Sequence, residues 1–218
     1  MNRNTFIYGI SDLADNLYYL LKKSGEEITG FIVDKAYKKS EFKEGLPIYE
    51  YEKLEDYFSK DTIDIYLCIG YSAMNKYRKE KFRDIKNKGY CLKNYIHETA
   101  LVETEMLGEG NLIFEQAYIG MFVQIGDGNI VYPRVTIAHH SQIHSFNYFS
   151  IGASIAGHVT IGDENFFGNL SLTKDKISIG NRNLIGAGTY ISDNVADDTV
   201  WVPQRSVCLP NKKGNDFL

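Results

Sequence analysis

Two adjacent histidines and a distant glycine are the residues of this chain best suited to chemistry. His139 and His140 stand together in the sequence, and Gly157 and His158 follow eighteen positions later. An imidazole can accept a proton near neutral pH, and a backbone amide can stabilise a developing oxyanion. If the fold brings His139 beside the Gly157 amide, the pair can support acyl transfer to an amine or a hydroxyl. The alternative is that these histidines only pack across a subunit interface.

The sequence around these residues repeats every six positions. From Leu101 to Ile191 every sixth residue is apolar, with Thr173 as the exception. A period of six is neither helical nor a simple strand alternation, and it predicts a solenoid in which each hexapeptide forms a short strand and a turn. Buried aliphatic side chains stacked inside this solenoid would form its core.

A second period of eighteen residues sets the size of one coil. Three hexapeptides therefore make one coil of a triangular prism, and stacked coils place His139 beside Gly157 and His140 beside His158. We expect glycine and asparagine to occupy tight corners with positive φ. The residues that recur with this period are Asn111, Asn129, Asn147, Asn165 and Asn183, together with Gly108, Gly126, Gly162 and Gly180, with His144 in the remaining glycine position.

Residues 1–98 have a different pattern, in which strands alternate with helices. This alternation predicts a small Rossmann-like parallel sheet with crossover connections. Ser11 is expected to cap the first helix, and the basic helix at 72–88 is expected to be a solvated face. The predicted strands are 5–9, 28–34, 63–70 and 90–96, and the predicted helices are 12–23, 51–58 and 72–88.

In such sheets, ligands bind beyond the carboxyl ends of the strands. Here those ends are residues 9–13, Asp34 with Lys35, and Gly70. One interpretation is a nucleotide site, in which amides at a helix N-terminus receive phosphates and Asp34 binds a base or ribose. The other is that the glycines are tight turns and Asp34 is a loop acid. Asp12 would repel a phosphate.

The composition excludes several classes of partner. With 44% hydrophobic and 24% charged residues and a net charge of −4, the chain gives no reason to expect a nucleic-acid partner. No apolar run is long enough to span a membrane. Three scattered cysteines are too few for a disulfide framework or a zinc knuckle. We therefore expect a cytoplasmic protein with reduced thiols and no metal.

Together these stretches resemble a known enzyme family. The repeat looks like the left-handed β-helix of hexapeptide acyltransferases, and the whole chain resembles the sialic-acid O-acetyltransferases and the bacillosamine N-acetyltransferase. The resemblance implies an α/β domain at 1–98 that binds a sugar nucleotide, followed by an all-β left-handed parallel β-helix at 99–218 with a C-terminal tail. The stretches that carry it are 7–9, 30–34, 69–70, 95–97, 137–141, 156–162 and 185–188.

The family implies a homotrimer that transfers an acetyl group from acetyl-CoA, the co-substrate, to a nucleotide-linked deoxyamino sugar for surface polysaccharide or glycan synthesis. His139 matches the catalytic base and Gly157 the oxyanion amide, while His140 stands where an acidic residue usually orients the base. The positions that match coenzyme A contacts are Tyr148, Gly157, Asn169 and Ala187, and those that match the sugar-nucleotide site are Ser11, Asp12, Leu13, Asp34, Lys35 and Gly70.

Three alternatives remain from the sequence. The same apparatus could acetylate a sugar hydroxyl. The chain could be an inactive scaffold that binds a sugar nucleotide, because the acidic partner of His139 is missing. It could also be a zinc lyase similar to β-helical carbonic anhydrases, since His139 and His144 have the ligand spacing of those enzymes, although Glu103 occupies the third ligand position.

Overall fold

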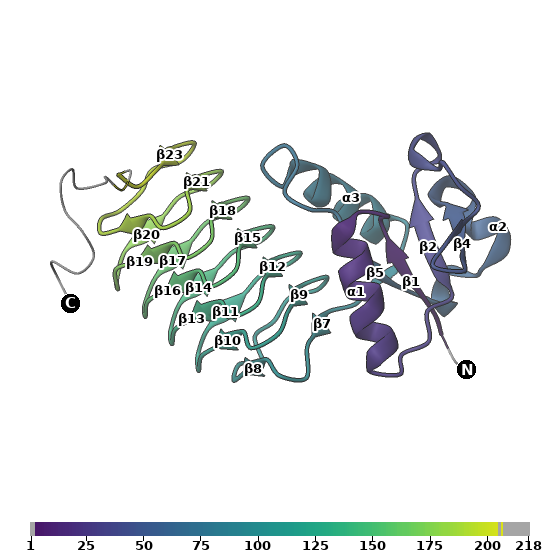
Figure 1. The fold of residues 1–218 in the computed structure, drawn as a ribbon, viewed down its shortest axis with the longest axis horizontal. Coiled ribbons are helices and arrows are strands. Elements are labelled where there is room, and N and C mark those ends of the chain that lie inside the picture. The colour runs from purple at the N-terminus through teal and green to yellow at the C-terminus, as the bar shows by residue number, and fades with distance from the viewer. Residues whose placement is uncertain (1–2, 205, 207–218) are drawn as a thin grey trace, which may run out of the picture.

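The computed structural model describes residues 3–204 and 206. An α/β unit lies beside a long β-helix (Figure 1). No helix in the described ranges has the length and apolar character that a membrane crossing requires. Residues 207–218 of the expected C-terminal tail lie outside the described residues.

The α/β unit contains a six-stranded sheet in the order β3-β4-β2-β1-β5-β6. All neighbouring strands are parallel except β3 and β4, so the predicted parallel sheet has an antiparallel edge. The strands are β1 (Asn4–Tyr8), β2 (Gly30–Val33), β3 (Phe42–Lys43), β4 (Leu46–Glu50), β5 (Ile63–Leu67) and β6 (Cys91–Leu92), and the helices are α1 (Asp12–Lys23), α2 (Leu54–Tyr57) and α3 (Lys76–Asn87).

The structure corrects two of the predicted elements. The edge hairpin of β3 and β4 lies between the predicted strand 28–34 and the predicted helix 51–58, where no strand was predicted. Its two-residue turn, Glu44-Gly45, has positive φ at both positions, the geometry that matches the twist of paired strands. The final predicted strand, 90–96, is divided: β6 pairs with β5, whereas β7 (Tyr95–Ile96) pairs with β9 in the β-helix. The division into domains at residue 98 stays a prediction.

The helices follow the sequence pattern more closely. Helix α1 spans Asp12–Lys23 as predicted, and Ser11 precedes it as the N-cap residue but makes no side-chain capping bond. Helix α3 begins at Lys76 rather than at residue 72. Three residues before it, Ala73, Met74 and Asn75, have positive φ, which a right-handed helix excludes.

The β-helix is a three-faced prism of parallel strands, as the hexapeptide period predicts. We call its faces the six-stranded, the four-stranded and the seven-stranded face. The six-stranded face has β8 (Leu101–Val102), β10 (Tyr118–Ile119), β13 (Thr136–Ile137), β16 (Ser154–Ile155), β19 (Leu172–Thr173) and β22 (Tyr190–Ile191). The four-stranded face has β11 (Gln124–Ile125), β14 (Gln142–Ile143), β17 (Thr160–Ile161) and β20 (Ser178–Ile179). The seven-stranded face has β7, β9 (Leu112–Ile113), β12 (Ile130–Val131), β15 (Tyr148–Phe149), β18 (Phe166–Phe167), β21 (Leu184–Ile185) and β23 (Val200–Trp201).

The aliphatic stack is the core of the prism, as predicted, with one change at its start. Residues such as Ile119, Ile137 and Ile155 are fully buried in one hydrophobic cluster. At the first coil, however, Val102 rather than Leu101 pairs with Ile119, and Leu101 is exposed. The first step along this face is therefore seventeen residues, and the strict eighteen-residue frame begins one hexapeptide later.

Glycine and asparagine serve different purposes from those expected. Positive φ occurs at the fourth place of the hexapeptides, often at residues other than glycine, such as Arg134 and His140. Gly126, at a second place, does not have positive φ; a Cβ there would lie 3.0 Å from the backbone of His144 on the next coil. The asparagines, at fifth places, are fully buried, and each side-chain oxygen accepts the amide hydrogen one coil further on, at distances of 2.8 or 2.9 Å.

The α/β unit packs against the seven-stranded face and the corner beside it. Leu17 of α1 shares a hydrophobic cluster with Leu112 and Tyr148, and Phe82 of α3 contacts Phe146. The basic helix is therefore not the solvated face that was expected.

Arg78 of α3 is the polar centre of this junction. Its side chain is fully buried, and its guanidinium donates to backbone carbonyls of both parts: Ile69 and Gly70 in the α/β unit, and Gly128, Phe146 and Asn147 in the β-helix. Burial lowers the pKa of this guanidinium to about 9. A second polar link is the ion pair between Lys79 and Glu164, at 2.5 Å.

Candidate active site

The two histidines and the glycine meet at the corner between the six-stranded and the four-stranded faces. His139 and His140 occupy the turn between β13 and β14, and Gly157 and His158 occupy the turn between β16 and β17. The backbone amide of His158 donates to the carbonyl of His139 at 3.0 Å, so the two turns stack directly. The eighteen-residue spacing thus brings these residues together as predicted.

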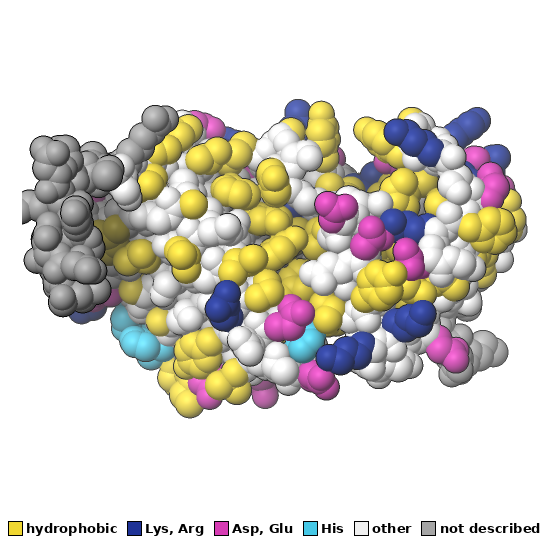
Figure 2. Space-filling model, viewed as in Figure 1, with side chains coloured by type: hydrophobic (Ala, Val, Ile, Leu, Met, Phe, Trp, Pro, Cys, Tyr) yellow, Lys and Arg dark blue, Asp and Glu magenta, His cyan; other side chains and the backbone are white. Residues whose placement is uncertain are grey.

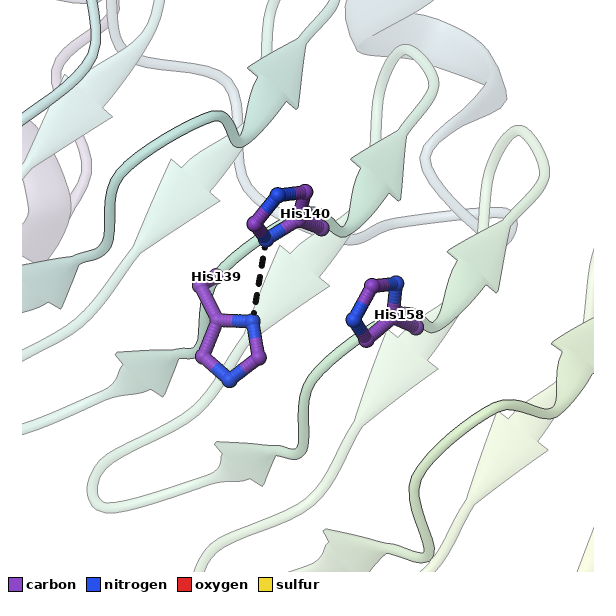
Figure 3. A group of neighbouring side chains, drawn as sticks. All are labelled: His139, His140 and His158. Atoms are coloured by element: carbon purple, nitrogen blue, oxygen red, sulfur yellow. Dashed lines mark hydrogen bonds between the residues drawn. The ribbon is translucent and has the colours of Figure 1, made fainter.

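Three imidazoles gather on this corner (Figure 3). Nδ1 of His139 lies 3.1 Å from Nδ1 of His140, within hydrogen-bond distance. The ring of His140 stacks on that of His158, with centroids 4.8 Å apart and an angle of 16°. The ring of His139 stands nearly perpendicular to both, at 87° and 86°. All three side chains are exposed.

His139 packs directly over Gly157. A Cβ built on this glycine would lie 2.9 Å from Cε1 and 3.1 Å from Nε2 of the His139 ring, so any larger residue would displace the imidazole. The Gly157 amide has no backbone acceptor among the described residues. A free amide therefore lies in the turn against which the His139 ring packs, which is the combination that acyl transfer requires.

Two buried hydroxyls hold the turn that carries Gly157, and the sequence reasoning missed both. Ser141 Oγ donates to the Ala156 carbonyl at 3.0 Å and accepts the Val159 amide hydrogen at 3.2 Å. Thr173, on the next coil, accepts the Ala156 amide hydrogen through its Oγ1 at 3.1 Å. Thr173 is the polar exception in the apolar frame, and it is buried and hydrogen-bonded.

The remaining histidines lie outside the cluster. His144 is exposed at the next corner of its coil, and His97 bonds to Thr99 before the first coil. The group of three histidines therefore contains His158, not His144, so the structure does not bring together within one chain the His139–His144 pair that a zinc lyase would need.

Of the four positions matched to coenzyme A, Gly157 lies against His139, and the other three lie on other parts of the prism. Asn169 and Ala187 are exposed at the corner between the seven-stranded and six-stranded faces, and they stack there, since the Gly188 amide donates to the Asn169 carbonyl at 2.8 Å. Tyr148 lies on the seven-stranded face, 7% exposed, with its ring stacked on Phe166. Burial and a hydrogen bond to Tyr132 raise its pKa. Within one chain, none of the three joins His139.

The α/β unit has a pocket of about 630 Å³ at the carboxyl ends of its strands. Of the six residues matched to the sugar-nucleotide site, Ser11, Asp34 and Gly70 line it. The other three predicted residues do not line it: Leu13 is buried in the core, Asp12 is exposed at the start of α1, and the Lys35 amide donates to the Glu52 carboxylate.

The pocket centres on Asp34. Its Oδ1 accepts from the Tyr8 hydroxyl at 2.6 Å and from Lys81 Nζ at 2.7 Å. Burial and the bond to Asp34 raise the pKa of Tyr8, which stays a hydrogen-bond donor. Lys81 belongs to α3, the basic helix that was predicted to face solvent. Helical periodicity does not predict that its partner is Asp34. Glu80 and Asp84 also line the pocket, so acids outnumber bases there.

Comparison with solved structures identifies proteins of the same fold. The acetyltransferase domain of PglB from Neisseria gonorrhoeae, in complex with acetyl coenzyme A, matches with a TM-score of 0.81 at 22% identity, over 92% of this chain and 96% of that one. A point mutant of perosamine N-acetyltransferase from Caulobacter crescentus, in complex with CoA and GDP-perosamine, matches with a TM-score of 0.79 at 22% identity, over 90% of this chain and 92% of that one. WeeI from Acinetobacter baumannii matches with a TM-score of 0.75 at 18% identity, over 91% and 96%.

These neighbours extend over nearly the whole chain, so the order of an α/β unit and a β-helix is shared as well as the repeat. The fold class predicted from the sequence, an α/β unit followed by a left-handed parallel β-helix, is confirmed. No protein-family model matches the chain, and no curated protein matches it.

Proposed function

We propose that this protein is an acetyl-CoA-dependent N-acetyltransferase that acts on the amino group of a nucleotide-linked deoxyamino sugar, with a product used in surface polysaccharide or glycan synthesis. The observation that carries the proposal is the packing of the His139 ring on Gly157, whose amide has no backbone acceptor in the described part of the chain. A base and an oxyanion donor lie in adjacent turns.

The reaction follows from this geometry. Only one of the two facing nitrogens of His139 and His140 can carry the shared proton. With this proton on Nδ1 of His139, Nε2 has a free lone pair and accepts a proton from the attacking amine. The amine nitrogen bonds to the thioester carbon, the Gly157 N–H stabilises the oxyanion, and the thiolate of coenzyme A leaves as the carbonyl reforms.

The structural neighbours support both substrates. The PglB domain binds acetyl coenzyme A, and the perosamine enzyme binds CoA with GDP-perosamine. By analogy the pocket at Asp34 receives the nucleotide part of the acceptor. Its second carboxylate oxygen has no partner among the described residues, so it can accept a hydrogen bond from a ribose hydroxyl or a base.

A homotrimer would complete the site. The His139 corner and the corner with Asn169 and Ala187 lie at opposite edges of the six-stranded face, so they can meet only when two prisms pack side by side. Exposed apolar side chains at Ile151, Leu170 and Tyr190 give this packing a surface. Figure 2 shows hydrophobic side chains spread over the β-helix and charged ones denser over the α/β unit.

The test uses purified protein, acetyl-CoA and a panel of 3-amino and 4-amino sugar nucleotides with their hydroxyl counterparts. Product mass spectrometry distinguishes N- from O-acetylation. His139→Ala should reduce turnover by about 10²–10⁴-fold, the usual contribution of a general base. Turnover by the variant at the wild-type rate would remove His139 as the base.

The shared site has its own test, which mixes two inactive variants. His139→Ala lacks the base, and Ala187→Trp fills the opposite corner. In randomly mixed trimers about a quarter of the sites combine an intact residue from each neighbour, so coexpression should restore about that fraction of wild-type activity. If each site lies within one chain, the mixture stays inactive, and light scattering shows whether the trimer forms at all.

A further inference from the structure

The imidazole of His158 has no part in the acyl transfer described above, yet it lies within the same cluster. One ligand nitrogen from each of His139, His140 and His158 lies within 4.8 Å of the other two. Figure 3 shows the three rings around a common gap on the outside of the prism. Three imidazoles converging on one point are a ligand set, and we propose that this cluster binds a transition-metal ion of the zinc class.

The spacing of the nitrogens fits such an ion. Zn–N bonds of 2.0–2.1 Å in a tetrahedral site place two ligand nitrogens about 3.3 Å apart, and the Nδ1 atoms of His139 and His140 are 3.1 Å apart. His158 stacks on His140, and rotation of its ring brings a nitrogen toward the same point. Its backbone is fixed by the hydrogen bond from its amide to the His139 carbonyl. All three ligands therefore belong to turns that are held together by backbone hydrogen bonds.

The ligand type selects the metal. Neutral imidazoles suit Zn²⁺, Ni²⁺, Cu²⁺ and Co²⁺, whereas Mg²⁺ and Ca²⁺ require oxygen ligands. Three ligands leave a fourth position open to water. The charged residues next along the same corner, Asp175 and Lys176, have opposite signs.

A metal ion at this position would stop the proposed reaction; this part of the inference rests on the proposed function. Coordination through Nδ1 of His139 breaks its hydrogen bond to His140 and leaves the ring proton on Nε2. The lone pair that would accept the proton of the amine is then absent. The metal is therefore an inhibitor of the transferase, and removing it with a chelator should restore full activity.

Binding is measured first, without reference to activity. Wild-type protein is titrated with Co²⁺ and Zn²⁺, by visible absorption for Co²⁺ and by calorimetry for Zn²⁺, with Mg²⁺ as the negative control. We expect one ion per chain, tetrahedral Co²⁺ bands that Zn²⁺ abolishes, and imidazole scattering from three ligands in X-ray absorption of the Zn²⁺-loaded wild type. Absence of saturable binding to the wild type would overturn the proposal without any variant.

The matched variants are His158→Asn and His144→Asn, which remove a histidine inside and outside the cluster. Asparagine tolerates the positive φ of position 158. Loss of His158 should weaken Zn²⁺ binding at least tenfold, because even the mutation of residues that only hydrogen-bond to metal ligands weakens binding by about that factor. The variant should also lose Zn²⁺ inhibition and keep its turnover in the absence of metal. His144→Asn should bind like the wild type. Equal affinity in both variants would refute the site, whereas Zn²⁺ binding without catalysis would refute only the proposed function.

Discussion

Replacement of Arg78 by methionine tests how the two parts of the molecule are joined. The guanidinium is fully buried and donates five hydrogen bonds, all to backbone carbonyls, at distances from 2.7 to 3.3 Å. Methionine has a similar length and no charge, so it keeps much of the packing and removes every donor. The variant therefore isolates the polar part of the junction.

The expected loss follows from the carbonyls left behind. Each buried acceptor without a donor costs about 1–3 kcal/mol, but the burial of the charge, which lowers the Arg78 pKa to about 9, is a cost that the variant no longer carries. The net loss is therefore smaller than the sum over the five carbonyls, about 3–5 kcal/mol. We expect a loss in that range for Arg78→Met. Arg78→Lys should lose less, because an ammonium keeps the charge and has three donors.

The assay is equilibrium unfolding in urea, followed by far-ultraviolet circular dichroism and by the fluorescence of Trp201, the only tryptophan. The matched control is Arg83→Met on the same helix; its side chain is exposed, and its stability should change by no more than about 0.5 kcal/mol. Because Arg78 also bonds to Gly70 in the Asp34 pocket, its loss should weaken sugar-nucleotide binding. A change below 1 kcal/mol for Arg78→Met would show that packing alone joins the two parts.

The other predictions concern the base, the asparagines, the pocket and alkaline pH. His140→Ala should lower kcat about tenfold, the value of one lost hydrogen bond of about 1.4 kcal/mol to His139, and His140→Asp should restore it in a steady-state assay. Asn147→Ala removes the acceptor of the Asn165 amide and should cost about 2–4 kcal/mol in urea unfolding, whereas the exposed Asn87→Ala should cost almost nothing. Asp34→Asn should raise the KM for the sugar nucleotide about tenfold with little change in kcat; an unchanged KM would place the nucleotide elsewhere. Burial raises the pKa of Tyr66 to about 12, above that of the unfolded chain, so its contribution to stability is complete below pH 10 and is lost as the pH rises toward 12, which unfolding at pH 9 and pH 11 would detect.

The repeat made one part of the site predictable. Because each coil has a fixed length, a spacing of eighteen residues is also a contact, and the sequence alone placed His139 on Gly157 and His140 beside His158. Asn169 and Ala187 have the same spacing, and their turns stack as well. No comparable rule connects His139 with those two residues or with Tyr148, and within one chain they lie on different parts of the prism.

No comparable spacing rule predicts the contacts between the α/β unit and the β-helix. Arg78, Lys79 and Lys81 recur with helical spacing, and a basic helix reads as a solvated face, yet Arg78 is fully buried and Lys79 and Lys81 pair with Glu164 and Asp34. The distant partners Gly128, Glu164 and Asp34 are 47 or more residues away, where no periodicity applies. The β3–β4 hairpin was missed for another reason, because Glu44-Gly45 is a weaker turn signal than Asn-Gly.

The asparagine ladder also fixes how the β-helix can change in length. An insertion of one residue within the frame would move residues such as Gly128, Glu164 and Arg182 into the places where a buried asparagine oxygen accepts a hydrogen bond, and the shift would pass to every later coil. Between Asn111 and Asn183, whole coils of eighteen residues can be added or removed without losing these bonds, and the end coils make the same bond across 17 and 16 residues. The surface beyond Gly157 can therefore grow or shrink only in steps of about 4.8 Å, one strand spacing. The length of any groove that runs along the prism therefore changes by whole strand spacings.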